Sequence, residues 1–265
     1  AIVLALPILR ARQFNNLAFP ALLLALAAAN ALVHLETLDL ARTAPLGLYG
    51  AASMVVMIMA IVGGRVVPSF TDNKLGSRAR RWKLLELTMP WLTLAALLGW
   101  LVAPTSGVAA VLAALAAALH GVRLAGWYTP RVWGVPLLWI LHLGYAWIVL
   151  GFALLALAAA GYVQAMSSAL HAFTAGGIGV LTLGMMARVS LGHTGRLLEP
   201  PPVMTWAFVA INLAALLRVV PPLLMPAITA PVMLASGLLW MAAFGLFVFV
   251  YTPMLLRPRV DGKPG

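Results

Sequence analysis

Long apolar runs dominate the chain, and short polar segments separate them. Runs of about twenty residues bounded by charge, Pro or Gly are long enough to cross the hydrocarbon core of a bilayer as helices. The pattern predicts an all-α fold: a polytopic transmembrane helical bundle of about eight complete spans, forming a single transmembrane domain over 1–265. The predicted spans are 16–35, 46–63, 85–103, 106–126, 133–160, 167–191, 203–225 and 230–256.

The segments outside these spans are short. The opening run AIVLALPIL is too short to cross a bilayer, which predicts that 1–9 is the remnant of a truncated helix. The polar stretch 64–83 is expected to be a basic cytoplasmic loop, and 257–265 a cytoplasmic tail. These segments have too few apolar residues for a core of their own, so no extramembrane domain is expected.

The basic residues test this division. Of the 17 Lys and Arg, all but Arg42 and Arg218 fall on one side of the predicted bundle. The positive-inside rule then places both termini in the cytoplasm. The net charge of +11 is therefore a topology signal and does not indicate a nucleic-acid partner, because the charges sit in short loops and form no basic face.

Composition limits the chemistry that the bundle can carry. The chain is 63% hydrophobic and 9% charged, with a mean hydropathy of +1.02, which is typical of an integral membrane protein with the lipid bilayer as its partner. The absence of cysteine excludes disulfides, iron–sulfur clusters and thiolate haem ligation. A metal would have to use His, Met, carboxylate or backbone ligands.

The five histidines fall into layers. His34 and His171 are expected near the outer surface, His120 and His142 in the cytoplasmic half, and His193 at the cytoplasmic mouth. Two pairs of metal ligands are therefore predicted, His34 with His171 and His120 with His142. A pair of imidazoles between helices can ligate a b-type haem, and Arg123, one turn from His120, is a candidate for a haem propionate.

The sixth predicted span carries a histidine near each end. His171 and His193 are about 33 Å apart along a helix, too far to ligate one iron. Helical periodicity places Thr174, Thr182, Met185 and His193 within about 60° of His171 on either side, which predicts one polar stripe facing the bundle interior. Copper is a second candidate metal, with soft thioether ligands from the methionines of the second and sixth spans: Met54, Met57, Met59, Met185 and Met186.

Each of these patterns has a structural alternative. A single membrane histidine more often hydrogen-bonds a neighbouring helix than binds a metal. Methionine clusters usually fill gaps in packing, and Arg188 is placed to extend its charge to the cytoplasmic surface. The segment GGRVVPSFT at 63–71 suits an anion site at Arg65, and it suits a helix end equally well.

Four segments together carry a family resemblance. LHAFTAGGIGVLTLGMMARVSLGHTGR at 170–196, GGRVVPSFT at 63–71, LHGVRLAGW at 119–127 and PLLWILHLGYAWIVLGF at 136–152 resemble the NnrS family of haem- and copper-containing bacterial membrane proteins. The likeness runs along essentially the whole chain. The segment that ends in LGHTGR is its most specific part.

The resemblance implies a protein of the bacterial inner membrane that binds haem b and copper, with nitric oxide as a ligand. It implies a link to denitrification and protection from nitrosative stress, and leaves turnover, sensing and protection open. Upstream spans with a further histidine motif would be missing, so the chain is expected to be a fragment of a protein with about twelve spans. The family-like positions are His34, His120, His142, His171, His193, Arg65, Arg188 and Arg196.

Three other classes of protein share some of these features. A haem–copper oxidase or nitric oxide reductase core needs about six ligating histidines with an adjacent pair, so five scattered histidines exclude it. A secondary transporter with a polar path lined by His and Arg is the runner-up, and Gly-rich 176–179 is its candidate helix break. A purely structural membrane subunit is the third class.

Overall fold

The computed structural model describes residues 1–162 and 164–263, and over these ranges it contains helices and no strands. Eight helical segments are long and apolar enough to cross a bilayer, as the sequence predicted. Most of their ends fall within a few residues of the predicted ones. The eight segments are Ala18–Thr37, Ala44–Leu75, Lys83–Val102, Gly107–Trp127, Pro136–Ala159, Ala165–His193, Pro202–Leu224 and Pro226–Leu255.

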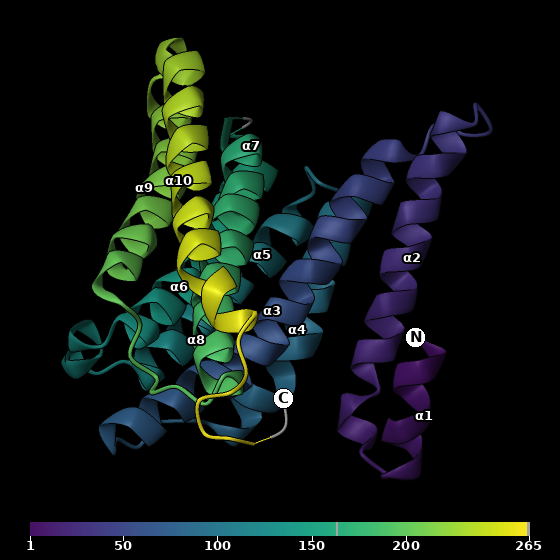
Figure 1. The fold of residues 1–265 in the computed structure, drawn as a ribbon. Coiled ribbons are helices and arrows are strands. Elements are labelled where there is room, and N and C mark those ends of the chain that lie inside the picture. The colour runs from purple at the N-terminus through teal and green to yellow at the C-terminus, as the bar shows by residue number, and fades with distance from the viewer. Residues whose placement is uncertain (163, 264–265) are drawn as a thin grey trace. The chain divides into compact units, whose positions relative to one another are not determined.

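The chain divides into two compact units, and the first covers Ala1–Ile61. It contains α1 (Ile2–Arg10), the short turn η1 (Phe14–Asn16), α2 (Ala18–Thr37) and the first half of α3 (Ala44–Leu75). In Figure 1, α1 lies beside α2. Two hydrogen bonds tie the α2–α3 turn: the Thr43 hydroxyl donates to the Leu32 carbonyl (2.6 Å), and the Ala44 amide donates to Glu36 (2.7 Å).

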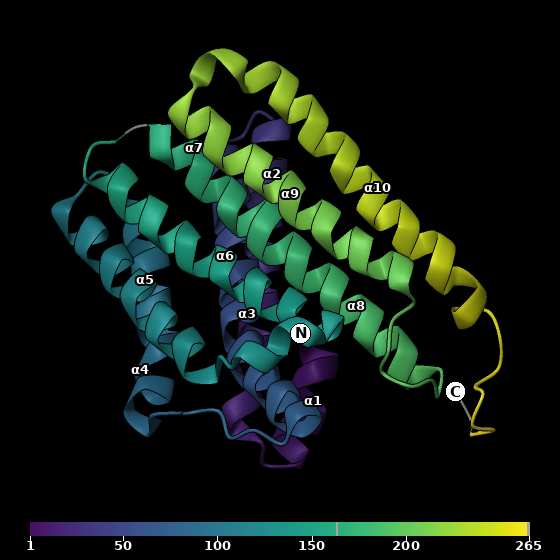
Figure 2. The ribbon, with the colours of Figure 1, turned by 90° about the vertical axis from the view of Figure 1, so that its left-hand side faces the viewer.

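The second unit runs from Val62 to the C-terminus, and successive helices pack side by side (Figure 2). Contacts join α4 to α5, α5 to α6, α6 to the α7–α8 segment, and α9 to α10. Most of α6 is buried because it has neighbours on both sides. The elements are α4 (Lys83–Val102), α5 (Gly107–Trp127), η2 (Pro130–Gly134), α6 (Pro136–Ala159), α7 (Gln164–His171), the π-helix η3 (Ala172–Ile178), α8 (Gly179–His193), α9 (Pro202–Leu224), η4 (Pro226–Ile228) and α10 (Thr229–Leu255).

One segment differs from its predicted structure. The sequence predicts a loop over 64–83, but α3 continues through it to Leu75 and leaves only a short connection before α4. Val67 and Pro68 on this part of α3 are buried, so packing outweighs the weak helix propensity of its Gly and Pro residues. Asp72 then organises the connection by accepting hydrogen bonds from the Ala79 amide (2.7 Å) and the Ser77 hydroxyl (3.2 Å).

The two ends of the chain differ in structure. The segment 1–9 is helical as part of α1. The tail 257–265 follows α10 without a regular helix as far as Lys263, and its last two residues lie outside the described part of the chain.

Glycines allow the central helices to approach closely. A Cβ at Gly144 of α6 would lie 2.7 Å from Cγ of Leu181 and 3.0 Å from its backbone nitrogen. A Cβ at Gly151 would meet the Phe173 ring at 2.5 Å in the same interface. The close contact between α6 and the η3–α8 segment therefore requires glycine at these two positions, as is common where membrane helices cross.

We expect Gly144→Ala to lower the free energy of unfolding by about 1–3 kcal/mol, because the new methyl group meets backbone that cannot move freely. The matched control is Gly237→Ala on α10, where a Cβ would meet no atom within 4 Å. Thermal unfolding in detergent, followed by circular dichroism, measures both. Equal stability of the two variants would contradict the close packing described for α6.

Candidate functional site

The five histidines differ in how deeply the structure buries them. His120 and His142 are buried on the adjacent helices α5 and α6, His171 is half-buried, and His193 is exposed. The predicted inner pair thus lies in one layer, because Tyr145, one turn from His142, contacts His120. His34 is exposed and belongs to the first unit, whereas His171 belongs to the second, so the predicted outer pair stays a prediction.

His120 lies at the centre of a buried hydrogen-bond chain. Its Nδ1 is 2.7 Å from the Tyr145 hydroxyl, and its Nε2 is 3.0 Å from the Thr93 hydroxyl. Its ring also stacks on Phe152, with centroids 5.4 Å apart. Both ring nitrogens are therefore occupied, and His120 has no lone pair free for a metal in this arrangement.

The partners fix the direction of every hydrogen bond in this chain. Arg123 can only donate, so the Tyr145 oxygen accepts from it (2.8 Å), and the Tyr145 proton is left to point at Nδ1 of His120. The Thr93 hydroxyl donates to the Met89 carbonyl (2.7 Å), so it accepts from Nε2 of His120. His120 is consequently the neutral tautomer with its proton on Nε2.

A salt bridge in the same cluster neutralises Arg123. Its Nε donates to Glu86 of α4 (3.0 Å), and a second, short contact joins its Nη2 to the other carboxylate oxygen. The Arg123 side chain is only 5% exposed, against 28% for Glu86. A bidentate pair of this kind satisfies both charges where water is scarce.

Arg123 could be named from the sequence, but Glu86, Tyr145 and Thr93 were missed. Glu86 had a usable signal, since it is the only acidic residue inside any predicted span and an acid at that depth requires a cationic partner. Tyr145 and Thr93 had none, because a hydroxyl on an apolar helix is compatible with many environments.

Helix α3 closes this cluster from another side. A Cβ at Gly64 would overlap the Arg123 guanidinium, and one at Gly63 would lie 3.0 Å from the Tyr145 ring. The Trp127 ring lies 5.2 Å from Cζ of Arg123 and 4.8 Å from the Tyr145 ring. The glycine pair of GGRVVPSFT is thus explained by contact with the buried arginine, while the adjacent Arg65 is exposed.

His142 differs from His120 in one decisive respect. Its Nδ1 is 2.9 Å from the Leu138 carbonyl, which can only accept, so Nδ1 carries the proton. Its Nε2 is buried and has no hydrogen-bond partner among the described residues. The Trp127 backbone carbonyl also interacts with the ring, but a carbonyl cannot donate a proton to a lone pair. His142 therefore holds a buried, oriented and unused imidazole nitrogen.

The predicted polar stripe runs through a π-helix. His171, Thr174, Thr182 and Met185 are all half-buried, whereas Phe173, Gly176 and Gly184 on the opposite face are buried against α6. These four residues border the packed interface, whereas His193, the fifth residue of the predicted stripe, is exposed. Each turn of η3 holds one residue more than an α-helical turn, so the side chains beyond η3 point in other directions than a regular α-helix would give them.

The motif LGHTGR forms the end of α8. The Arg196 amide donates to the Leu191 carbonyl (2.9 Å) and the Gly195 amide to the Gly192 carbonyl (3.2 Å), with Gly195 at a φ of +74°. This is a Schellman cap, which requires the left-handed backbone that glycine adopts without strain. The specific glycine of the motif therefore terminates the helix that carries His193.

The C-terminal tail docks on this cap. The Val260 amide donates to the Thr194 carbonyl (3.2 Å), and Nη1 of Arg259 donates to the His193 carbonyl (2.9 Å). Arg259 also forms a bidentate pair with Asp261 through Nε (2.9 Å) and Nη2 (2.6 Å). Nearby, Arg188 stacks its guanidinium carbon 3.6 Å from the centre of the Phe70 ring.

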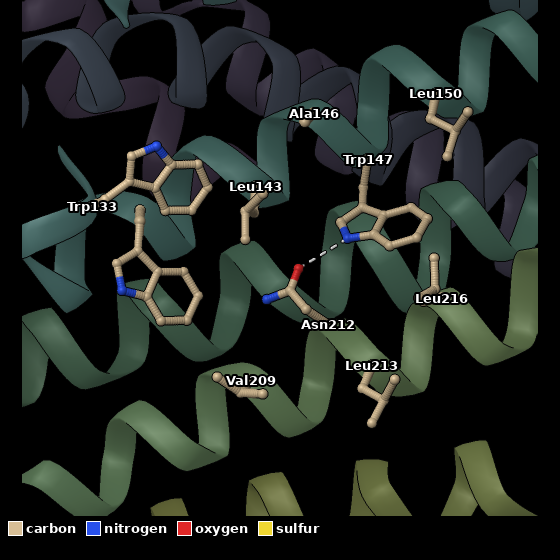
Figure 3. Close-up of a pocket in the computed structure, with 10 residues that line it drawn as sticks. Trp133, Leu143, Ala146, Trp147, Leu150, Val209, Asn212, Leu213 and Leu216 are labelled. Atoms are coloured by element: carbon tan, nitrogen blue, oxygen red, sulfur yellow. Dashed lines mark hydrogen bonds between the residues drawn. The ribbon is translucent and has the colours of Figure 1, made fainter. Parts of the chain in front are cut away.

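An apolar groove lies between α6 and α9 (Figure 3). It has a volume of about 740 Å³, and its one polar pair is the Trp147 indole, which donates to Asn212 (3.0 Å). Asn212 in turn donates to the Phe208 carbonyl (2.8 Å), so its polar groups are satisfied. Over the described residues, no three His, Asp or Glu side chains gather at one point where they could hold a metal ion.

Comparison with known proteins gives one finding. The family model described as NnrS protein matches residues 1–259, which is nearly the whole chain. No curated protein and no solved structure matches the chain significantly.

We expect Tyr145→Phe to lower the free energy of unfolding by about 1–3 kcal/mol, because it leaves Nδ1 of His120 and a donor of Arg123 buried without their partner. Tyr251→Phe is the matched control, since the Tyr251 hydroxyl is buried without a hydrogen bond among the described residues. Removing that hydroxyl should leave stability unchanged or raise it. Thermal unfolding of both variants is the measurement, and a loss as large in Tyr251→Phe would contradict the role given to the Tyr145 hydroxyl.

Docking of the tail should depend on pH. Hydrogen bonds from Arg259 hold the pKa of Asp261 at about 2, below its ordinary value of 3.8. Because the docked tail favours the ionised carboxylate, its contribution is fully present above pH 3.8 and is lost as the pH falls through about 2. Hydrogen exchange at the Val260 amide, corrected for the intrinsic rate, should rise over this range. Asp261→Asn should exchange rapidly at every pH, and protection independent of pH in the unaltered chain would refute the assignment.

Proposed function

The chain belongs to the NnrS family, and from this premise we propose that it is a haem-binding protein of the bacterial inner membrane that acts in the response to nitric oxide. Its eight apolar helices suit a multi-pass protein in a lipid bilayer. The proposal includes a link to denitrification and to protection from nitrosative stress.

The observation that carries the haem proposal is the free Nε2 of His142. A haem ligand must offer a neutral imidazole nitrogen with a lone pair, and its other nitrogen commonly donates to a backbone carbonyl that fixes the ring. The bond from Nδ1 to Leu138 supplies this orientation. A buried lone pair without a donor is otherwise unfavourable, so a metal at this position would satisfy it.

The residues fit one axial ligand better than the predicted pair. His120 cannot turn a nitrogen toward a metal without breaking its bond to Thr93 or Tyr145. We therefore propose that His142 would hold the haem iron and that His120 positions α4, α5 and α6. A bound haem with one protein ligand would supply an open iron position for nitric oxide, as a sensor, a protective protein or an enzyme would each require.

Arg123 does not fit the predicted contact with a haem propionate as it stands. Two of its nitrogens bond to Glu86 and a third to Tyr145, so its charge is already neutralised. Of the remaining family-like positions, His34, His171 and Arg65 stay candidates for binding a cofactor, whereas Arg188 and His193 line a different cavity at the end of α8. Of these, His171 is the half-buried imidazole of the polar stripe.

Copper is the second cofactor of the proposal. Imidazole and thioether ligands suit copper in its reduced state. His171 and Met185 are half-buried and are separate candidates for it, because they lie roughly 21 Å apart along the helical segment and cannot bind the same ion. Met54 and Met57 are buried in the first unit, where gap-filling explains them equally well.

The transporter alternative lacks the observation that it requires. A discontinuous helix would expose unwound backbone at the substrate site. The Gly-rich segment 176–179 instead lies within the continuous helical segment Ala165–His193, where the hydrogen-bonded turn widens to a π-helix. The break expected of a transporter is therefore absent from this part of the chain.

We expect His142→Gln to abolish most of the Soret absorbance of the purified protein, because the variant loses the only buried, unused imidazole nitrogen among the described residues. His193→Gln, which changes an exposed histidine, should keep the band at wild-type intensity. The measurement is the visible spectrum, oxidised and dithionite-reduced, per mole of protein with matched circular dichroism. A full Soret band in His142→Gln would refute the ligand assignment.

A further inference from the structure

A cavity of about 360 Å³ opens where α8 ends and the C-terminal tail docks. Its basic wall is formed by Arg188, His193 and Arg259, and its apolar wall includes Phe70, Val189 and Leu198. All of these residues belong to the second unit. The cavity takes no part in the haem proposal, which rests on His142.

Arg188 is the group in this cavity that lacks a partner. Its guanidinium makes no hydrogen bond or ion pair with any described residue, and its one contact of this kind is the stacking on Phe70 at 3.6 Å. Its Cζ lies over the ring, and its N–H groups have no hydrogen-bond acceptor among the described residues. A half-buried arginine that stacks on an aromatic ring and has unpaired N–H groups can bind an oxyanion through two hydrogen bonds.

The second arginine that lines the cavity is already paired with a carboxylate. Arg259 is paired with Asp261, which neutralises its charge. Arg259 also donates a hydrogen bond to the His193 carbonyl at the negative end of α8. Glu199, which follows the lining residue Leu198 in the chain, pairs with Lys74 at 3.5 Å. Arg188 therefore provides the net positive charge, and Arg259 and His193 can add further donors.

We propose that this cavity binds a phosphate group, with Arg188 as its principal ligand. The phosphate can belong to the headgroup of an anionic phospholipid or to a free anion in solution. The apolar wall and the position at the end of a membrane helix suit the headgroup, whose glycerol and acyl chain need apolar contact. The charge and the open donors of Arg188 suit both.

Two measurements on the full chain separate these sources. Native mass spectrometry of protein extracted from nanodiscs with equal phosphatidylglycerol and phosphatidylcholine reports the retained lipid. Thermal unfolding in detergent, with inorganic phosphate against chloride at matched ionic strength, reports the free anion. The variants are Arg188→Gln and Arg188→Lys, and the control is Arg131→Gln, which removes an exposed arginine in η2 outside the cavity.

We expect the wild type and Arg131→Gln to retain phosphatidylglycerol selectively, and Arg188→Gln to retain about tenfold less, in line with the loss of a charge-assisted bidentate contact. Arg188→Lys should retain an intermediate amount of phosphatidylglycerol, because lysine keeps the charge but cannot form the bidentate hydrogen bonds of a guanidinium. If phosphate instead raises the melting temperature of the wild type and not of Arg188→Gln, the ligand is a free anion.

The proposal is overturned if the Arg188 variants match Arg131→Gln in both measurements. Arg188→Lys, checked by circular dichroism, keeps the test valid if Arg188→Gln fails to fold. Haem content, measured from the same samples, should not change in the Arg188 variants. Failure of the phosphate site is thus distinguishable from failure of the haem proposal.

Discussion

The buried charge of Arg123 constrains how the helices of the second unit can pack. An unpaired guanidinium at this depth would cost several kcal/mol, so α4 must place Glu86, and α6 must place Tyr145, within reach of it. Helix α3 must present Gly63 and Gly64, because any side chain there would occupy the space of the arginine or the tyrosine. His120 and Thr93 extend the same hydrogen bonds deeper into the bundle, so four helices meet correctly only in one arrangement.

The two buried histidines show how one residue type takes on different chemistry on neighbouring helices. His120 has a hydroxyl at each nitrogen and is saturated. His142 has a carbonyl of its own helix at one nitrogen and no donor at the other. The difference depends on which residues face each ring across the helix interfaces. Burial therefore does not identify a ligand, whereas an unused lone pair does.

Much of the fold could be predicted from the sequence, because hydropathy and the placement of Lys and Arg follow directly from the cost of polar groups in lipid. The helical extension of α3 to Leu75 could not, since the stabilising contacts of Val67 and Pro68 are tertiary. In the candidate site, the placement of His120 and His142 on adjacent helices was predictable, and the pairing of Arg123 with Glu86 had a signal that went unused. The roles of Tyr145 and Thr93, and the free nitrogen of His142, depend on side-chain directions that spacing does not determine.

The π-helix in the sixth span has a consequence for how this segment tolerates change in its length. A π-turn accommodates one residue more than an α-turn, so Ala172–Ile178 stores an insertion without breaking the helix. Loss of one residue there would convert the segment to a regular α-helix and leave the residues beyond it facing nearly as before. A regular α-helix that kept all seven residues of η3 would instead rotate everything beyond it by about 100°. His171 would keep its neighbours, while Arg188 and the cap at Gly195 would turn away from Phe70 and the C-terminal tail. A single surplus residue therefore determines how one end of this span is rotated about the helix axis relative to the other.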